Sequence, residues 1–105
     1  MENIEIKGLE NLDDKEKKIA DKLFNEYYNK INRALKNFKL KIHIKIYDKE
    51  GKSKKFSINI ESFSSAGFFE GSFADWNLAK TIHNVFNKIE TQIEHKLHIS
   101  DQHKR

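Results

Sequence analysis

Lysine is the side chain in this sequence with the clearest chemical potential, because it recurs at a fixed spacing in two neighbouring segments. Lys41, His43 and Lys45 alternate with apolar residues, and Lys55 holds a matching position in the next alternating segment. Side chains two residues apart share one face of a β-strand, so these four predict one cationic surface. Lysine offers phosphate a compact charge, whereas arginine is better shaped for reading bases. The pattern favours a phosphate-bearing partner, and the competing interpretation is a solvated face whose lysines keep the strands soluble.

Further cations extend this basic character beyond the alternating segments. Arginine occurs only at Arg33 and Arg105, so the positive charge is carried almost wholly by lysine. Carboxylates dilute the charge of the first helical segment, which holds Glu16, Asp21 and Glu26. The remaining cations of interest are Lys49, Lys52 and Lys54 in or near a turn, and Lys15, Lys18, Lys22, Lys30 and Arg33 in the helical segment.

Five histidines raise the question of a metal site. His95 and His98 are three residues apart near an expected helix end, and His103 follows them. No carboxylate is spaced to complete a rigid site with these three, and isolated surface histidines are commoner than ligands. We therefore predict no metal site and no cofactor, with His43 on the outer face of the sheet and His83 on a helix flank.

The sequence contains no arrangement typical of an enzyme. The absence of cysteine excludes a thiolate nucleophile and a disulfide. Gly67 and Gly71 do not have the spacing of a phosphate-binding loop. Ser62, Ser64 and Ser65 lack the context of a nucleophile elbow. We predict a non-enzymatic protein without a small-molecule substrate.

A group of aromatic residues has two possible roles. If exposed, the rings could stack on nucleic-acid bases or meet a protein partner. If buried, they would fill the space between the last strand and the final helix, which is the interpretation we favour. The group consists of Phe63, Phe68, Phe69, Phe73 and Trp76.

Two amphipathic helices are predicted from apolar residues at steps of three and four. The first follows a cap at Asp13 or Asp14, carries its apolar stripe from Ile19 and runs to about Asn37. The second spans residues 75–97 and is capped by Asp75. Each helix must place its stripe on another apolar surface.

Period-two alternation predicts four strands around these helices. A short strand at 4–6 precedes the first helix, and strands at about 40–47, 55–61 and 68–73 lie between the helices. A turn at 48–51 joins the central pair, and a serine-rich loop at 62–67 leads to the last strand. The expected fold is α+β in the order β-α-β-β-β-α, with both helices packed on one face of a four-stranded sheet.

Size and composition limit the organisation of the chain. Its 105 residues predict a single domain over residues 1–97, followed by a flexible tail at 98–105. The formal net charge of +4 favours an acidic partner. No stretch has the apolar length of a membrane span, and the N-terminus lacks a signal-peptide pattern, so we expect a cytoplasmic protein without a membrane partner.

Several segments resemble the ribosome hibernation promoting factor family, also called ribosome-associated inhibitors. The final helix carries Asn77-Leu-Ala-Lys-Thr-Ile82 and Asn87-Lys-Ile-Glu-Thr-Gln-Ile93, at the separation of the family's Met-Tyr-Ala-Ala-Ile-like and Asp-Lys-Leu-Glu-Arg-Gln-Leu runs. Ala20-Asp-Lys-Leu23 is similar in position to the family's Glu-Lys-Leu helix, and the strand Lys41-Ile-His-Ile-Lys-Ile46 also fits. Two features differ. Thr91 replaces the family's arginine, and the segment 63–67 stands where the family has a tighter strand connection.

The resemblance implies a factor of the family's short form, without its further dimerising domain. Such a factor lodges in the small ribosomal subunit where tRNA and mRNA would bind, contacts rRNA and inhibits translation during stress-induced hibernation. Matching motif positions predict RNA contacts at Lys22, Lys88 and Gln92. Charge and expected exposure add Lys41, Lys45, Lys55, Lys80 and Lys96.

A small protein-interaction module without RNA affinity is the alternative. An exposed strand edge or the aromatic segment around Phe63, Phe68 and Phe69 would then form a homodimer or bind a partner. The sequence leaves open the oligomeric state, and whether the partner is rRNA, another RNA or a protein.

Overall fold

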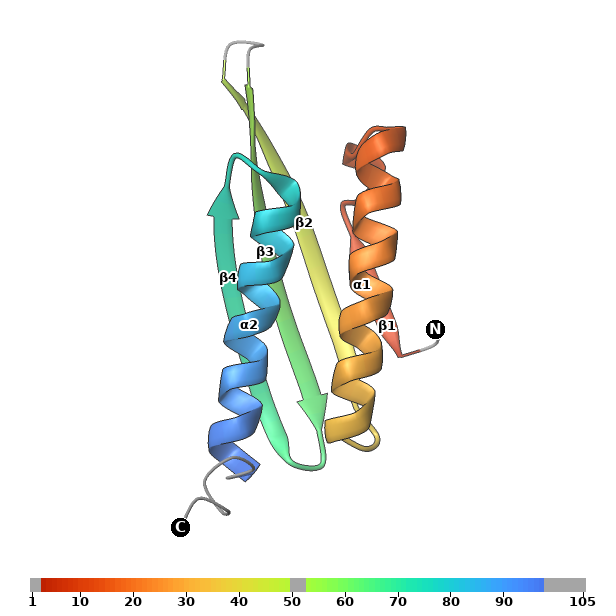
Figure 1. Ribbon diagram of the computed structural model, residues 1–105, viewed down its shortest axis with the longest axis vertical. Helices are drawn as coiled ribbons and strands as arrows, with labels where there is room; N and C mark the ends of the chain where they lie inside the picture. The colour runs from red at the N-terminus through yellow and green to blue at the C-terminus, as the bar shows by residue number, and fades with distance from the viewer. Residues whose placement is uncertain (1–2, 50–52, 98–105) are drawn as a thin grey trace.

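The computed structural model describes residues 3–49 and 53–97 as one sheet covered on one face by two helices (Figure 1). The expected tail at 98–105 lies outside these residues. The elements are β1 (Ile4–Lys7), a 3-10 turn η1 (Leu9–Asn11), α1 (Asp14–Ala34), β2 (Lys39–Lys49), β3 (Ser53–Ser64), β4 (Gly67–Asp75) and α2 (Leu78–Leu97). The predicted fold class and element order are confirmed.

The four strands follow one another in the sheet in sequence order. β1 pairs in parallel with β2, so that Ile4 lies opposite Leu40. β2–β3 and β3–β4 are antiparallel. Because strand side chains alternate, Leu40, Ile42 and Ile44 face the helices and are buried, while the residues between them face away.

The core lies between the sheet and the helix pair. From α1, Phe24 and Tyr27 reach Phe86 of α2, with ring centroids 6.0 and 4.6 Å away respectively. The predicted stripe of α1 is too wide at its margins, because Ile19 and Ala34 are exposed. Both positions therefore contribute little to the core, although Ala34 borders a surface pocket that Glu90 and Ile93 of α2 also line.

A capping box fixes the start of α1. The Asp13 carboxylate accepts the backbone N–H of Glu16 at 2.8 Å, and the Glu16 carboxylate accepts the N–H of Asp13 at 2.9 Å. Asp13 is therefore the cap of the two candidates. The helix ends at Ala34, earlier than the expected Asn37, because Leu35 is extended and Asn37 has a positive φ of 53°.

The start of α2 corrects the sequence prediction by three residues. Asp75 remains in β4, where it pairs with Phe56, and the helix begins at Leu78. Asn77 is the cap, since its side-chain oxygen accepts the N–H of Lys80 at 2.8 Å. Asp75 instead accepts the N–H of Asn77 at 3.0 Å, which fixes the chain just before the helix.

The expected loop at 62–67 is a tight hairpin turn. β3 continues to Ser64, which pairs directly with Gly67. The Ser64 hydroxyl accepts the N–H of Ala66 at 3.1 Å and donates to the carbonyl of Gly67 at 3.2 Å. Gly67 has a φ of 134°, which a residue with a side chain rarely adopts. The segment that the sequence predicted as a loop is therefore a tight connection between two paired strands.

Candidate nucleic-acid interface

The sheet face opposite the helices is left uncovered by the elements that the structure describes (Figure 1). We call the outward-pointing residues of β1 to β4 the open sheet face. Its two ends differ in charge, because the strand register fixes which outward residues lie beside one another.

One end of the open sheet face is basic. Lys45 lies opposite Ser57, which lies opposite Ala74. Lys55 lies opposite Tyr47. Within these rows, as far as the structure describes them, no carboxylate accompanies the lysines. We call this region the basic–aromatic end; its residues are Lys7, His43, Lys45, Tyr47, Lys55 and Trp76.

Two exposed aromatic rings flank Lys55 at the basic–aromatic end. Tyr47 is 53% exposed and Trp76 is 49% exposed. The Lys55 ammonium lies 5.6 Å from the centre of the Trp76 ring, a cation–π distance. Because Lys55 alternates with buried Phe56, this contact places the indole beside the open sheet face.

The aromatic group as a whole does not fill the core as we expected. Phe69 is buried and Phe73 is partly buried against the core. Phe63, Phe68 and Trp76 are exposed instead, because strand alternation points both phenylalanines outward. The Phe63 and Phe68 rings pack together with centroids 5.1 Å apart.

Lys41 lies at the other, mixed end of the open sheet face. Its direct neighbours across the strands are Glu5 on β1 and Glu61 on β3, and Glu61 in turn lies opposite Glu70. The Lys41 ammonium lies 5.7 Å from the centre of the Phe63 ring. The carboxylates offset the charge of Lys41, so it is a weaker candidate for phosphate contact than Lys45 or Lys55.

Lys54 does not belong to the basic surface. Its ammonium lies 3.1 Å from a Glu16 carboxylate oxygen and 3.9 Å from Asp13, at the start of α1. This ion pair joins the central hairpin to the helix layer. Lys52 and the side chain of Lys49, the other turn lysines, lie outside the described part of the structure.

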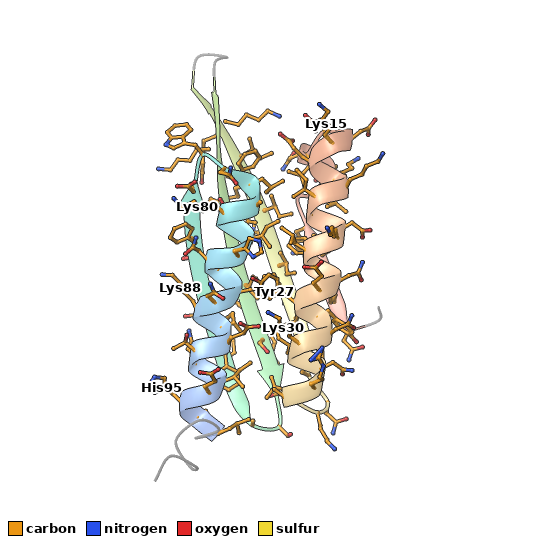
Figure 2. The ribbon with its side chains drawn as sticks, viewed as in Figure 1. Lys15, Tyr27, Lys30, Lys80, Lys88 and His95 are labelled. Carbon is orange, nitrogen blue, oxygen red and sulfur yellow. The ribbon has the colours of Figure 1, made fainter. Side chains whose placement is uncertain are left out.

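A second cationic region follows the outer side of α2. Lys80 and Lys88 are exposed, and Figure 2 shows Lys88 extending away from α1. The Lys88 ammonium lies 5.8 Å from the centre of the Phe73 ring on β4. A Cβ placed on Gly71 would be 3.2 Å from that of Lys88, so the helix and strand are in close contact here.

Gln92 uses its side-chain amide to hold β4. Its oxygen accepts the backbone N–H of Glu70 at 3.1 Å, and its nitrogen donates to the Glu70 carbonyl at 2.6 Å. We call this pair of bonds the Gln92–Glu70 clamp. An RNA contact by Gln92 stays a prediction, and the structure adds a positioning role that the sequence did not reveal.

The remaining predicted contacts lie on separate surfaces. Lys22 is exposed on α1, which belongs to the helix layer on the opposite side of the sheet from the open sheet face (Figure 1). Lys96 is exposed near the end of α2, where its Cε would lie 3.7 Å from a Cβ on Gly67. The structure therefore places Lys41, Lys45 and Lys55 on the same face of the sheet, with Lys41 at the other end from the latter two. It leaves Lys22 and the lysines of α2 (Lys80, Lys88 and Lys96) apart from them.

Sequence reasoning missed a polar contact between the two helices. The Tyr27 hydroxyl and His83 Nδ1 form a hydrogen bond at 2.6 Å, and the Lys30 ammonium lies 5.0 Å from the Tyr27 ring (Figure 2). Burial raises the pKa of Tyr27, and nearby Glu90 adds to this. His83 is exposed on the helix flank and His43 on the open sheet face, as predicted.

Burial also raises the pKa of Glu90 on α2, an effect that Lys30 opposes and Glu94 reinforces. The folded protein therefore holds this proton more tightly than the unfolded chain does. By linkage, ionising Glu90 costs stability near neutral pH, and the cost is relieved as the pH falls through the raised pKa.

Neither a metal centre nor a membrane helix is found in the part of the chain that the structure describes. Within residues 3–49 and 53–97, no three His, Asp or Glu side chains gather in a group that could hold an ion. His98 and His103, which the sequence raised as ligands with His95, lie outside the described residues. None of the described helices combines the length and apolarity needed to cross a membrane.

Comparison with solved structures identifies a similar fold in the N-terminal domain of Thermus thermophilus Protein Y. The TM-score is 0.57 at 17% sequence identity, and the match covers 88% of this chain and 92% of that domain. No protein-family model matches the sequence. No curated protein matches it either. At this level of identity the likeness establishes a shared fold.

Proposed function

We propose that this protein is a cytoplasmic, non-enzymatic factor that binds the small ribosomal subunit through rRNA and inhibits translation during ribosome hibernation. One observation carries the proposal: at the basic–aromatic end, Lys45 and Lys55 have no carboxylate opposite them on the neighbouring strands. A rigid domain with such a surface can bind folded rRNA phosphates without any catalysis. The motif resemblance in α2 and the fold shared with the Protein Y domain support the same function.

The proposed contacts are of unequal strength. Lys45 and Lys55 come first, because their rows are uncompensated. Lys41 follows, since Glu5 and Glu61 lie beside it. Contacts from other surfaces would come from Lys22, Lys80, Lys88, Gln92 and Lys96.

Co-sedimentation with purified small subunits at increasing salt tests this function. We expect the protein to pellet with the subunits and to dissociate as salt rises, with each phosphate contact adding about 0.7–0.9 to the log–log slope. Reversing Lys41, Lys45 and Lys55 together should weaken binding and lower the slope by about one for each phosphate that is no longer neutralised. Binding that ignores salt would contradict the proposal.

Single reversals sharpen this experiment. K45E and K55E should each weaken subunit binding more than K41E, because a compensated lysine contributes less to the local potential. K36E is the matched control, since Lys36 is exposed outside the proposed contacts. Circular dichroism establishes that each variant remains folded. If K36E weakened subunit binding as much as K45E and K55E do, binding would depend only on the net charge of the protein and not on these positions.

The exposed Phe63–Phe68 pair favours a second candidate function, a homodimerising or partner-binding module. Sedimentation equilibrium of the isolated protein separates the two functions. A tight dimer that is insensitive to salt, is lost in F68S and shows no subunit binding would replace the ribosomal proposal with this one.

A further inference from the structure

We propose that the basic–aromatic end of the open sheet face binds single-stranded RNA, with Trp76 and Tyr47 stacking on unpaired bases and Lys45 and Lys55 holding the adjoining phosphates. The inference rests on the proposed function in taking RNA as the partner. It goes further by specifying that the RNA bound at this surface is single-stranded and by assigning the residues that contact its bases and phosphates.

The arrangement of rings and charges carries the inference. Tyr47 on β2 and Lys55 on β3 are cross-strand neighbours. Trp76, which directly follows the end of β4, lies beside Lys55 on its other side. Neighbouring strands are about 4.8 Å apart, so the two rings lie on either side of a cation, roughly 10 Å from each other. Alternating flat rings and positive charges match the alternating bases and phosphates of a polynucleotide.

The backbone on both sides of Trp76 is held in place, which limits the positions that the ring can take. On its N-terminal side Asp75 is fixed in β4 opposite Phe56, and on its C-terminal side Asn77 caps α2. The Asp75 carboxylate also accepts the Asn77 N–H at 3.0 Å. The backbone is thus held on both sides of an indole that is 49% exposed. A side chain on a fixed backbone segment loses less freedom on binding than one on a loop that must first become ordered.

The positive charge of this surface and the need for accessible base faces together favour single-stranded RNA as the ligand. Lys45 and Lys55 have neutral cross-strand neighbours, and His43 lies between the cation Lys7 and the neutral Asn59. This end therefore attracts a polyanion. In a duplex the faces of the bases are covered by their neighbours, so a protein ring can stack only where bases are unpaired. A single strand satisfies both conditions, whereas a duplex or an acidic peptide satisfies only the charge.

Trp76 is the one tryptophan of the sequence and so reports its own environment. The probe is a ten-nucleotide adenine-rich RNA, titrated into the full-length protein while the Trp76 emission is followed. We expect saturable quenching that weakens with salt. The RNA duplex of equal length, inorganic polyphosphate and poly-glutamate should bind at least tenfold more weakly and leave the emission nearly unchanged.

Variants separate stacking from charge, with affinities measured by the anisotropy of a labelled oligonucleotide. Y47A and W76A should each lose roughly 5- to 150-fold in affinity, the value of one stacked base. F68A, an exposed ring at the opposite end of the same face, is the matched control and should bind as the wild type does. Circular dichroism verifies folding.

The inference is overturned if the duplex or poly-glutamate binds as tightly as the single strand, or if Y47A and W76A bind normally. Parallel co-sedimentation distinguishes this failure from failure of the proposed function. Wild-type protein that pellets with small subunits but ignores the oligonucleotide overturns the stacking surface alone. Protein that binds the oligonucleotide but not the subunits overturns the ribosomal function alone.

Discussion

Ser62 places a hydroxyl group in the apolar interior. The residue is fully buried, and its Oγ has no hydrogen-bond partner among the described residues. It lies on β3 between Leu40 of β2 and Phe69 of β4. A buried hydroxyl without a partner carries its full desolvation cost, so this position lowers the stability of the fold.

We expect S62A to leave the stability unchanged or raise it by about 1 kcal/mol, because alanine removes the unpaired group while nearly keeping the shape. Urea denaturation measures the change. Thr81 provides the contrast, since it is also buried but donates its hydroxyl to the Asn77 carbonyl at 2.7 Å. T81V should lose about 1 kcal/mol. A comparable loss in S62A would mean that Ser62 has a partner after all.

Individual residues also mark the limit of prediction from sequence. Alternation alone places Lys45 and Lys55 on the outer face, because the period of a strand is two. The same rule does not reveal that Lys54 pairs with Glu16, 38 positions away in the chain. It also does not reveal that Lys41 lies beside Glu5, because the parallel pairing of β1 and β2 sets that neighbour.

At the scale of elements, the Gln92–Glu70 clamp joins α2 to the outer strand of the sheet. β4 pairs with β3 on one side only, and the N–H and carbonyl of Glu70 are both taken by the Gln92 amide. Unpaired groups on an edge strand invite pairing with another chain. The clamp blocks that pairing at the middle of β4.

We expect Q92A to be less stable by about 1–3 kcal/mol, the net value of two hydrogen bonds, and to self-associate at high concentration. Urea denaturation and sedimentation velocity measure the two effects. T91A, a change at the exposed neighbouring position, is the control and should show neither. A stable, monomeric Q92A would show that the clamp is dispensable.

Element boundaries were predictable where a local pattern controls them. The capping box at Asp13 and Glu16 has a recognisable spacing, and its helix begins where expected. The start of α2 was displaced because Asp75 and Asn77 are both good caps, and pairing of β4 with Phe56 decides between them. The hairpin turn at Ser64 was mistaken for a loop because serines and glycine suit either structure.

The whole molecule has its lysines on several surfaces rather than one. The sequence identified which residues are cationic, and the predicted two-layer fold with one uncovered sheet face is confirmed. It also assigned the cations to helices and strands, but it could not tell which groups lie beside each cation, because strand register and helix rotation decide that. The difference in charge between the two ends of the open sheet face therefore becomes visible only when all four strands are placed side by side.

Stability should also be uneven across the molecule. β1 has four residues and pairs only with β2, whereas β2 and β3 are long and paired on both sides. We expect β1 amides to exchange with deuterium at least roughly tenfold faster than those of Ile44 and Ile58, as NMR would measure, because short edge strands open locally. Equal protection would mean that β1 separates only on global unfolding.

The parallel pairing of β1 has a consequence for how the chain is made. Ile4 and Ile6 lie opposite Leu40 and Ile42, and the 21 residues of α1 stand between the partners. During synthesis β1 is made before β2, so Ile4 and Ile6 lack their partners on β2 until α1 and then β2 have been translated. The meander of the other three strands joins segments close in sequence, whereas β1 is completed only by a strand that is translated after α1.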